Sequence, residues 1–150
     1  MNIDDIKNIA IIGAGNMGHQ IAMLCAIHGY KTVCTDINAE ILSKAENFAD
    51  TYLAGRVEKG RLNQEQATAT RKRLSFTASM EDAVKDADYV IEAVLEILDL
   101  KRKIFADLDR MAPSHAILAT NSSAIISSKI ADATKRPEKC SMFIFSTRPS

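Results

Sequence analysis

A short glycine-rich segment near the amino terminus constrains the fold of this chain more than any other stretch. Residues 9–12 form a continuous apolar run, and Gly13, Gly15 and Gly18 follow it at once in the pattern G-x-G-x-x-G. A short, β-branched apolar run is typical of a strand buried on both faces of a parallel sheet. The segment therefore predicts a strand, a tight turn and the start of a helix.

The same segment predicts a site for phosphate groups. In such a turn, Gly13 makes the bend, Gly15 lets the backbone approach a pyrophosphate, and Gly18 lets the helix pack closely on the strand. Asn16 and Met17 lie in the turn and at the start of the helix. The free N–H groups and positive dipole end of that helix would face the phosphates.

An acidic residue makes this prediction more specific than a glycine pattern alone. Asp36 follows the second apolar run, roughly 20 residues after the glycine turn, which is the spacing of a dinucleotide-binding unit. Its carboxylate would accept hydrogen bonds from the adenosine ribose hydroxyls and repel a 2′-phosphate. The three marks together predict NAD rather than NADP; the alternative is a glycine turn beside an exposed aspartate.

Composition and charge exclude several other classes of protein. The chain has 150 residues, 47% of them hydrophobic and 25% charged, with a formal net charge of zero. Balanced charge does not favour nucleic-acid binding or a membrane surface, and no apolar segment approaches the roughly 20 residues that span a bilayer. The first residues lack a basic leader, so we expect a cytoplasmic protein. Its three cysteines and three histidines show no metal-site spacing, so we expect no metal and reduced thiols.

Strand-like and helix-like segments alternate along the chain. We expect strands over 9–12, 74–77, 88–94 and 116–120, a second strand that begins at Val33 and Cys34 and ends before Asp36, and helices over 16–28, 38–58, 63–74, 79–84 and 98–111. Such alternation predicts an α/β fold with a Rossmann-type doubly wound, mainly parallel sheet and ligands at the carboxyl ends of the strands. Two helices between the second and third strands indicate a helical insertion. The charge run at 101–103 is expected on a solvated helix face.

Four motifs in this order resemble the NAD-binding domain of the L-3-hydroxyacyl-CoA dehydrogenases, including the bacterial 3-hydroxybutyryl-CoA enzymes. They are the glycine turn at 13–18, Asp36, the stretch 92–96 followed by Lys101, and the stretch 119–123. The resemblance runs from about residue 7 to residue 140. It implies an NAD-dependent oxidoreductase of fatty acid metabolism.

The resemblance also implies roles for individual residues. Glu96 and Lys101 would contact the nicotinamide half of NAD, and Asn121 would lie beside the nicotinamide and the substrate. Ser123 would hydrogen-bond the substrate oxygen, and Lys59 would bind coenzyme A phosphates. The plainer alternatives are a helix N-terminal charge for Glu96, a loop hydroxyl for Ser123 and a surface lysine for Lys59.

The sequence departs from the family's pattern after residue 140. In the family, a general-base histidine lies in a His-Phe-Phe-Asn-Pro stretch on the sixth strand, and Ile144 occupies that position here. The family stretch Met-Val-His-Phe-Phe-Asn-Pro-Ala-Leu can be written in codons that begin ATG GTT CAT. Deleting one G from the ATGGTT junction shifts the reading frame, and the new frame encodes residues 142–150. We therefore expect residues 1–142 to form the NAD-binding Rossmann domain and 143–150 to be an aberrant, frameshifted tail. The family's C-terminal helical dimerisation domain would then be absent.

Two functions of different classes follow. The first is the truncated NAD-binding domain of an NAD-dependent L-3-hydroxyacyl-CoA dehydrogenase, inactive in this form. The intact protein would be a homodimer that oxidises 3-hydroxyacyl-CoA to 3-ketoacyl-CoA. The alternative is a stand-alone NAD-binding or sensing module that never had catalysis. Another β-hydroxyacid dehydrogenase fits the stretches around Lys101 and Asn121 less well.

Overall fold

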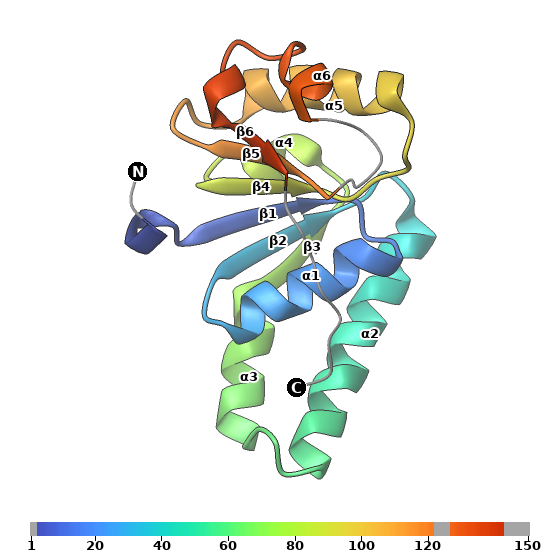
Figure 1. The fold of residues 1–150 in the computed structure, drawn as a ribbon. Coiled ribbons are helices and arrows are strands. Elements are labelled where there is room, and N and C mark those ends of the chain that lie inside the picture. Colours follow the sequence, from blue (N-terminus) through green and yellow to red (C-terminus); the bar gives the residue numbers. More distant parts are fainter. Residues whose placement is uncertain (1–2, 122–126, 143–150) are drawn as a thin grey trace.

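A computed structural model describes residues 3–121 and 127–142 of the chain, which build a six-stranded parallel sheet between two layers of helices (Figure 1). The strands are β1 (Asn8–Ile12), β2 (Lys31–Thr35), β3 (Leu74–Thr77), β4 (Tyr89–Glu92), β5 (Ile117–Thr120) and β6 (Cys140–Met142). They lie in the order β3-β2-β1-β4-β5-β6, and every neighbouring pair is parallel. The strand order reverses between β1 and β4, and ligands of open α/β sheets bind at such a switch point. The Rossmann-type fold predicted from the sequence is confirmed.

The helices divide between the two faces of the sheet. In chain order they are α1 (Asn16–Ile27), α2 (Ala39–Glu58), α3 (Gln64–Arg73), α4 (Met80–Val84), α5 (Leu98–Met111) and α6 (Ser127–Ala131), with 3₁₀ turns η1 (Ile3–Asp5) and η2 (Pro137–Lys139). The helices α1, α2 and α3 lie on one face, and α4, α5 and α6 lie on the other (Figure 1).

Two hydrophobic clusters fill the space between the sheet and these layers. Successive residues of β1 point to opposite faces: Ile9 and Ile11 belong to the cluster under α1 and α2, and Ala10 and Ile12 to the cluster under α4 and α5. All four are buried. A strand covered on both faces can be apolar throughout, which explains the continuous run that precedes the glycine turn.

The helical pair α2 and α3 forms the predicted insertion after β2. Asn63 begins α3 with a capping box: its Oδ1 accepts a hydrogen bond from the Gln66 N–H at 2.7 Å, and the Gln66 Oε1 accepts from the Asn63 N–H at 3.0 Å. Arg71 on α3 donates from Nε to Asp50 Oδ1 on α2 at 2.8 Å. Its Nη2 also lies 3.5 Å from Glu46 Oε1, so this one arginine links α3 to two carboxylates of α2.

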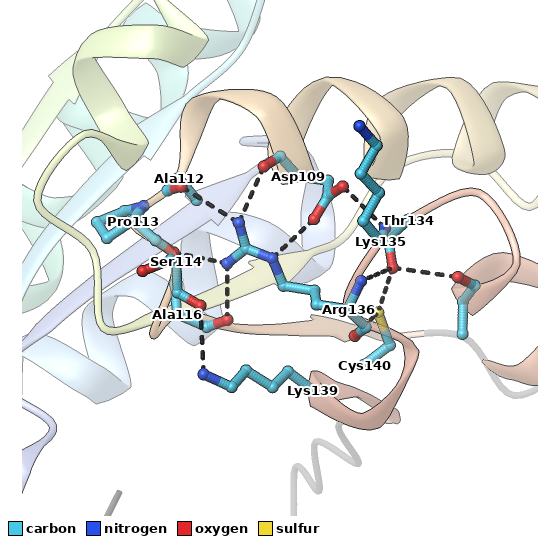
Figure 2. A network of polar contacts seen from close by, with 11 residues as sticks. Asp109, Ala112, Pro113, Ser114, Ala116, Thr134, Lys135, Arg136, Lys139 and Cys140 are labelled. Atoms are coloured by element: carbon cyan, nitrogen blue, oxygen red, sulfur yellow. Dashed lines mark hydrogen bonds and ion pairs between the residues drawn. The ribbon is translucent and has the colours of Figure 1, made fainter.

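One arginine joins the end of α5 to the segment that leads into β6 (Figure 2). The Arg136 guanidinium donates to Asp109 Oδ1 at 2.7 Å, to the carbonyl oxygens of Pro113 and Ala116 at 2.6 and 3.1 Å, and to those of Asp109 and Ala112 at 2.9 and 3.3 Å. A guanidinium has five N–H donors, so this buried side chain is fully satisfied. It caps carbonyls that the end of a helix leaves without partners.

Candidate functional site

The glycine turn lies at the carboxyl end of β1, at the switch point of the sheet. Gly13 has φ +104° and donates its N–H to the Thr35 carbonyl oxygen at 2.8 Å, which ties the turn to β2. A Cβ atom at Gly13 would lie 2.7 Å from the Ala93 carbonyl oxygen after β4. Both the backbone conformation and this close approach therefore require glycine.

The other two glycines differ in what surrounds them. A Cβ atom at Gly18 would lie 1.7 Å from the Gly13 carbonyl oxygen, so α1 can pack on the turn only without a side chain there. A Cβ atom at Gly15 would meet no described atom within 4 Å. Gly15 is the N-cap of α1, without a side-chain cap in the described structure, and Asn16 and Met17 begin the helix. This arrangement leaves backbone N–H groups and open space where the sequence predicts a pyrophosphate.

Asp36 is held beside the turn by two backbone groups. Its Oδ2 accepts from the Ala14 N–H at 2.9 Å and its Oδ1 accepts from the Asn38 N–H at 2.9 Å. Asn38 is in turn the N-cap of α2 and accepts from the Ile41 N–H at 3.0 Å. An ionised carboxylate has roughly four acceptor positions, so each oxygen keeps capacity for a ribose hydroxyl.

A second polar group lies fully buried at the carboxyl ends of β4 and β5. The Glu92 carboxylate accepts from Lys101 Nζ at 2.8 and 2.7 Å, from the Thr120 hydroxyl at 2.6 Å and from the Val94 N–H at 2.7 Å. The Glu92 carbonyl oxygen also accepts from the Asn121 N–H at 2.8 Å. These bonds join β4, β5 and α5 at the edge of the sheet where the glycine turn lies.

The structure corrects one expectation for the charge run at 101–103. Lys101 does not lie on a solvated helix face: its side chain is 0% exposed, and its Nζ lies between Glu92 and Glu96, 3.6 Å from Glu96 Oε1. The Glu96 side chain is 45% exposed. The physical reason is the Glu92 carboxylate, which points from β4 under α5 and supplies the partner that a buried ammonium requires.

The other residues named from the sequence do not all join this group. Asn121 lies at the end of β5 beside Glu92, and Ser123 and Ile144 lie outside the described residues. Lys59 is the C-cap of α2, whose 20 residues place it about 30 Å along the helix from the end that carries Asn38. The glycine turn, Asp36, Glu96, Lys101 and Asn121 therefore share the carboxyl edge of the sheet, and Lys59 does not.

All three histidines belong to the described residues, and they lie away from the carboxyl ends of β4 and β5. His19 packs its ring on Phe48 at 4.4 Å between centroids, and its Nδ1 lies 2.7 Å from the Gly15 carbonyl oxygen. His28 is the C-cap of α1. His115 Nε2 lies 2.7 Å from Asp88 Oδ1, at the amino end of the sheet. None of them stands where a base would meet a substrate beside Asn121.

The thiols are poor candidates for chemistry. Burial raises the pKa of Cys34 to about 12 and that of Cys25 to about 11. A thiol is nucleophilic as its thiolate, so both remain protonated and unreactive near neutral pH. Among the described residues, no group of three or more histidine, cysteine or acidic side chains could hold a metal ion, and no helix is long and apolar enough to cross a membrane.

Sequence reasoning placed Glu92 and Thr120 in polar clusters but gave neither of them a role. Both side chains are fully buried: the Glu92 carboxylate accepts from Lys101, and the Thr120 hydroxyl donates to Glu92. A signal was present, because each is the last residue of an otherwise apolar strand. A buried charge at such a position needs a partner of opposite sign, and the sequence alone did not identify Lys101 as that partner.

Comparisons with known proteins show the family to which this domain is similar. Residues 8–149 match the family model described as 3-hydroxyacyl-CoA dehydrogenase, NAD binding domain. The chain is 38% identical over 135 residues to the 3-hydroxyadipyl-CoA dehydrogenase of Escherichia coli (strain K12), covering 90% of this chain and 28% of that protein. It is 36% identical over 135 residues to the probable 3-hydroxybutyryl-CoA dehydrogenase of Bacillus subtilis (strain 168), covering 90% and 47%.

Solved structures give the same result. The 3-hydroxybutyryl-CoA dehydrogenase from Escherichia coli K12 matches with a TM-score of 0.91 and 36% identity, over 95% of this chain and 30% of that chain. The (S)-3-hydroxybutyryl-CoA dehydrogenase from Ralstonia eutropha matches with a TM-score of 0.89 and 32% identity, over 95% and 50%. The chain therefore spans half or less of the length of these relatives.

Proposed function

Since this chain belongs to the 3-hydroxyacyl-CoA dehydrogenase family and carries its NAD-binding domain, we propose that it binds NAD as the cofactor part of a 3-hydroxyacyl-CoA dehydrogenase. The family's cofactor is NAD, and the family consists of oxidoreductases. The observation that carries the proposal is the pairing of open space at Gly15 with the Asp36 carboxylate, which accepts from the N–H of Ala14, the preceding residue of the same turn.

Each part of the cofactor has a candidate partner along the carboxyl edge of the sheet. The pyrophosphate would lie at Gly15, where the N–H groups of Asn16 and Met17 begin α1. The adenosine ribose would donate hydroxyl hydrogen bonds to Asp36. The nicotinamide half would lie across the switch point, toward Glu96 and Asn121.

We propose an acyl-CoA with a 3-hydroxyl group as the substrate of the intact protein. The support is the relatives' names, which include 3-hydroxybutyryl-CoA and 3-hydroxyadipyl-CoA dehydrogenases. Oxidation would remove a hydride from C3 to the nicotinamide and the hydroxyl proton to a base, giving a 3-ketoacyl-CoA. Ser123 would hydrogen-bond the substrate oxygen, and Lys59 would meet coenzyme A phosphates. A homodimer of the intact protein, as in the family, belongs to the same proposal.

The 150-residue chain should bind the cofactor without turning over the substrate. Isoleucine at position 144 cannot accept a proton, and no described histidine stands beside Asn121. A general base must reach the proton that it removes.

Calorimetry and an absorbance assay test the two halves of this proposal. We expect NAD to bind with at least about tenfold preference over NADP, because Asp36 would repel a 2′-phosphate. We expect no NADH absorbance when the chain is mixed with NAD and 3-hydroxybutyryl-CoA. A chain that binds neither nucleotide would contradict the cofactor proposal, and measurable NADH formation would contradict the inactivity.

A stand-alone NAD sensor is the second candidate function, favoured by Ile144 at the position of the base. The coding DNA separates the two functions: a His-Phe-Phe-Asn-Pro reading of codons 142–150 in another frame, followed by a helical domain in that frame, supports the enzyme. The cytoplasmic location also stays a proposal, since a relative from Arabidopsis thaliana is named a peroxisomal protein.

A further inference from the structure

We propose that Glu92 is a positioning residue for the nicotinamide half of the cofactor, acting through Lys101 on Glu96. This inference rests on the proposed function, because it concerns how the same site holds NAD. Glu92 itself is completely buried, so its carboxylate is not presented at the surface where a cofactor would lie.

The Glu92 carboxylate is fixed from three directions. It receives two hydrogen bonds from Lys101 on α5, one from the Thr120 hydroxyl on β5 and one from the Val94 N–H after β4. Bonds to a charged acceptor in a buried place are short and strong, and these span 2.6 to 2.8 Å. The carboxylate therefore has one orientation, set by three separate elements.

Lys101 connects the buried Glu92 to Glu96, which lies at the rim of the site. Its ammonium has three donors; two point to Glu92, and Glu96 Oε1 lies 3.6 Å from the same nitrogen. Two carboxylates thus share one ammonium, and the partly exposed one is Glu96. In this structure Lys101 is 0% exposed, so the group that it holds at the rim of the site is the Glu96 carboxylate.

The location of this group fits the nicotinamide half rather than the adenosine half. Glu92 pairs with Ile12 on β1, directly before the glycine turn, and with Thr120 on β5, directly before Asn121. Asp36 lies on the other side of the turn, after β2. A cofactor that crosses the switch point would therefore place its two halves on Asp36 and on Glu96.

A buried ion pair is not itself a reason for stability. Replacing both members with apolar groups of similar size is often neutral or stabilising, whereas removing one member is costly. We therefore look for a role of the Glu92–Lys101 pair other than stability, and holding the orientation of Glu96 is such a role. This difference also provides a variant that keeps the fold and loses the proposed role.

The test compares NAD with ADP, which lacks the nicotinamide and its ribose, by calorimetry on the 150-residue chain. In the double variant Glu92→Gln/Lys101→Met, we expect NAD to bind about tenfold more weakly, the size of one lost hydrogen bond to a charged group. ADP binding should stay within about twofold of its original value, because the Asp36 side of the site is unchanged. Glu138→Gln, an exposed residue in η2, is the control that makes the same change of side chain.

A second comparison separates positioning from a merely structural role. Glu96→Gln alone should reproduce the loss in NAD binding, and adding Glu92→Gln/Lys101→Met to it should cause no further loss, because both act on one contact. Independent effects would multiply instead.

A stably folded Glu92→Gln/Lys101→Met variant that keeps the original ratio of NAD to ADP affinity, either because neither affinity falls or because both fall equally, would overturn the inference. Effects that multiply in the second comparison would also overturn it. An original chain that binds neither NAD nor ADP would overturn the proposed function, and the inference with it.

Discussion

The three glycines of the turn, Gly13, Gly15 and Gly18, have different roles, and substitutions can separate the roles of Gly15 and Gly18. Gly15→Ala should leave the fold intact, because its φ of −69° suits alanine and a Cβ atom would enter open space in the described structure. NAD affinity should fall by about tenfold or more, since that space is where the backbone must approach the pyrophosphate. Calorimetry measures the affinity, and urea unfolding measures the stability.

The matched control is Gly18→Ala in the same turn. Its Cβ atom would lie 1.7 Å from the Gly13 carbonyl oxygen, so the helix must shift. We expect a loss of about 3 kcal/mol in the free energy of unfolding, the upper part of the range for overpacking. If Gly15→Ala lost stability and kept NAD binding, the assignment of the open space to the pyrophosphate would be wrong.

Asp36 should govern the choice between NAD and NADP. Asp36→Asn removes the negative charge and keeps an oxygen that can accept from a backbone N–H, as Asp36 does from Ala14 and Asn38. We expect the ratio of NAD to NADP affinity to fall by about tenfold, because like-charge repulsion of the 2′-phosphate disappears. Calorimetry with both nucleotides measures the ratio; an unchanged ratio would mean that Asp36 does not face the ribose.

The sequence was more informative about these residues than about Lys101. Gly18 is constrained by Gly13 in the same turn, Gly13 by its own positive φ, and Asp36 by its place after a strand, so spacing along the chain reveals them. Lys101 is paired with Glu92 across a loop and a helix turn, and its burial depends on how α5 lies on the sheet. The adjacent charges of Arg102 and Lys103 led instead to the expectation that Lys101 lies on a solvated helix face.

At the level of elements, Arg136 should stabilise the carboxyl-terminal part of the sheet more than any exposed ion pair. Arg136→Lys keeps the charge but offers three donors to five acceptors on Asp109, Ala112, Pro113 and Ala116. We expect a loss of about 3 kcal/mol in the free energy of unfolding, because buried carbonyls lose their partner. Urea unfolding followed by circular dichroism measures it.

Arg110→Lys is the control for this substitution on the same helix. Arg110 lies 3.1 Å from Asp107 Oδ1, but its side chain is 67% exposed. An exposed pair of this kind contributes about 0.5 kcal/mol or less, so the control should be nearly neutral. Equal losses in the free energy of unfolding of the two variants would show that the buried network around Arg136 stabilises the fold no more than an exposed ion pair does.

Helix boundaries followed from the sequence because caps are local. Asn63 and Gln66 form the capping box that their spacing predicts. The fourth strand was harder: the predicted range 88–94 shortens to β4, Tyr89–Glu92. The Val94 N–H donates to the Glu92 side chain instead of a neighbouring strand, so the chain leaves the sheet there. A side-chain competitor for a backbone donor cannot be read from apolar periodicity.

For the whole molecule, two aspartates link stability to acid pH. Burial would raise the pKa of Asp88, but hydrogen bonds from His115 and from the backbone of Lys7 and Asn8 outweigh it, so the pKa lies below its usual value. The same holds for Asp109: burial would raise its pKa, but hydrogen bonds from Lys135 and Arg136 outweigh burial, so the pKa lies below its usual value.

Carboxyl groups with a lower pKa in the folded state stabilise it above their unfolded pKa. We therefore expect the free energy of unfolding to fall below about pH 4, as the pH passes through the folded pKa values of these groups. Urea unfolding across this range should show a shallower fall for Asp88→Asn than for the original chain. An identical slope would show that Asp88 does not contribute to the acid limb.

The parallel sheet was predictable from the sequence because strands and helices alternate with few exceptions. The order of all six strands was not, since it depends on which face each crossover takes. The strand order matters for function because it places Asp36 and Glu96 on opposite sides of the glycine turn.

A cofactor lying across that turn would contact both halves of the sheet, so binding should stabilise the domain as a unit. At a concentration 100 times the dissociation constant, NAD should add about 2.7 kcal/mol to the free energy of unfolding. For a chain of this length, that raises the melting temperature by about 5–10 °C. Differential scanning calorimetry with increasing NAD measures the shift. At the same NAD concentration, Gly15→Ala should show a much smaller shift, because its affinity is lower while its fold is unchanged. A full shift in that variant would place the stabilising contact away from the glycine turn.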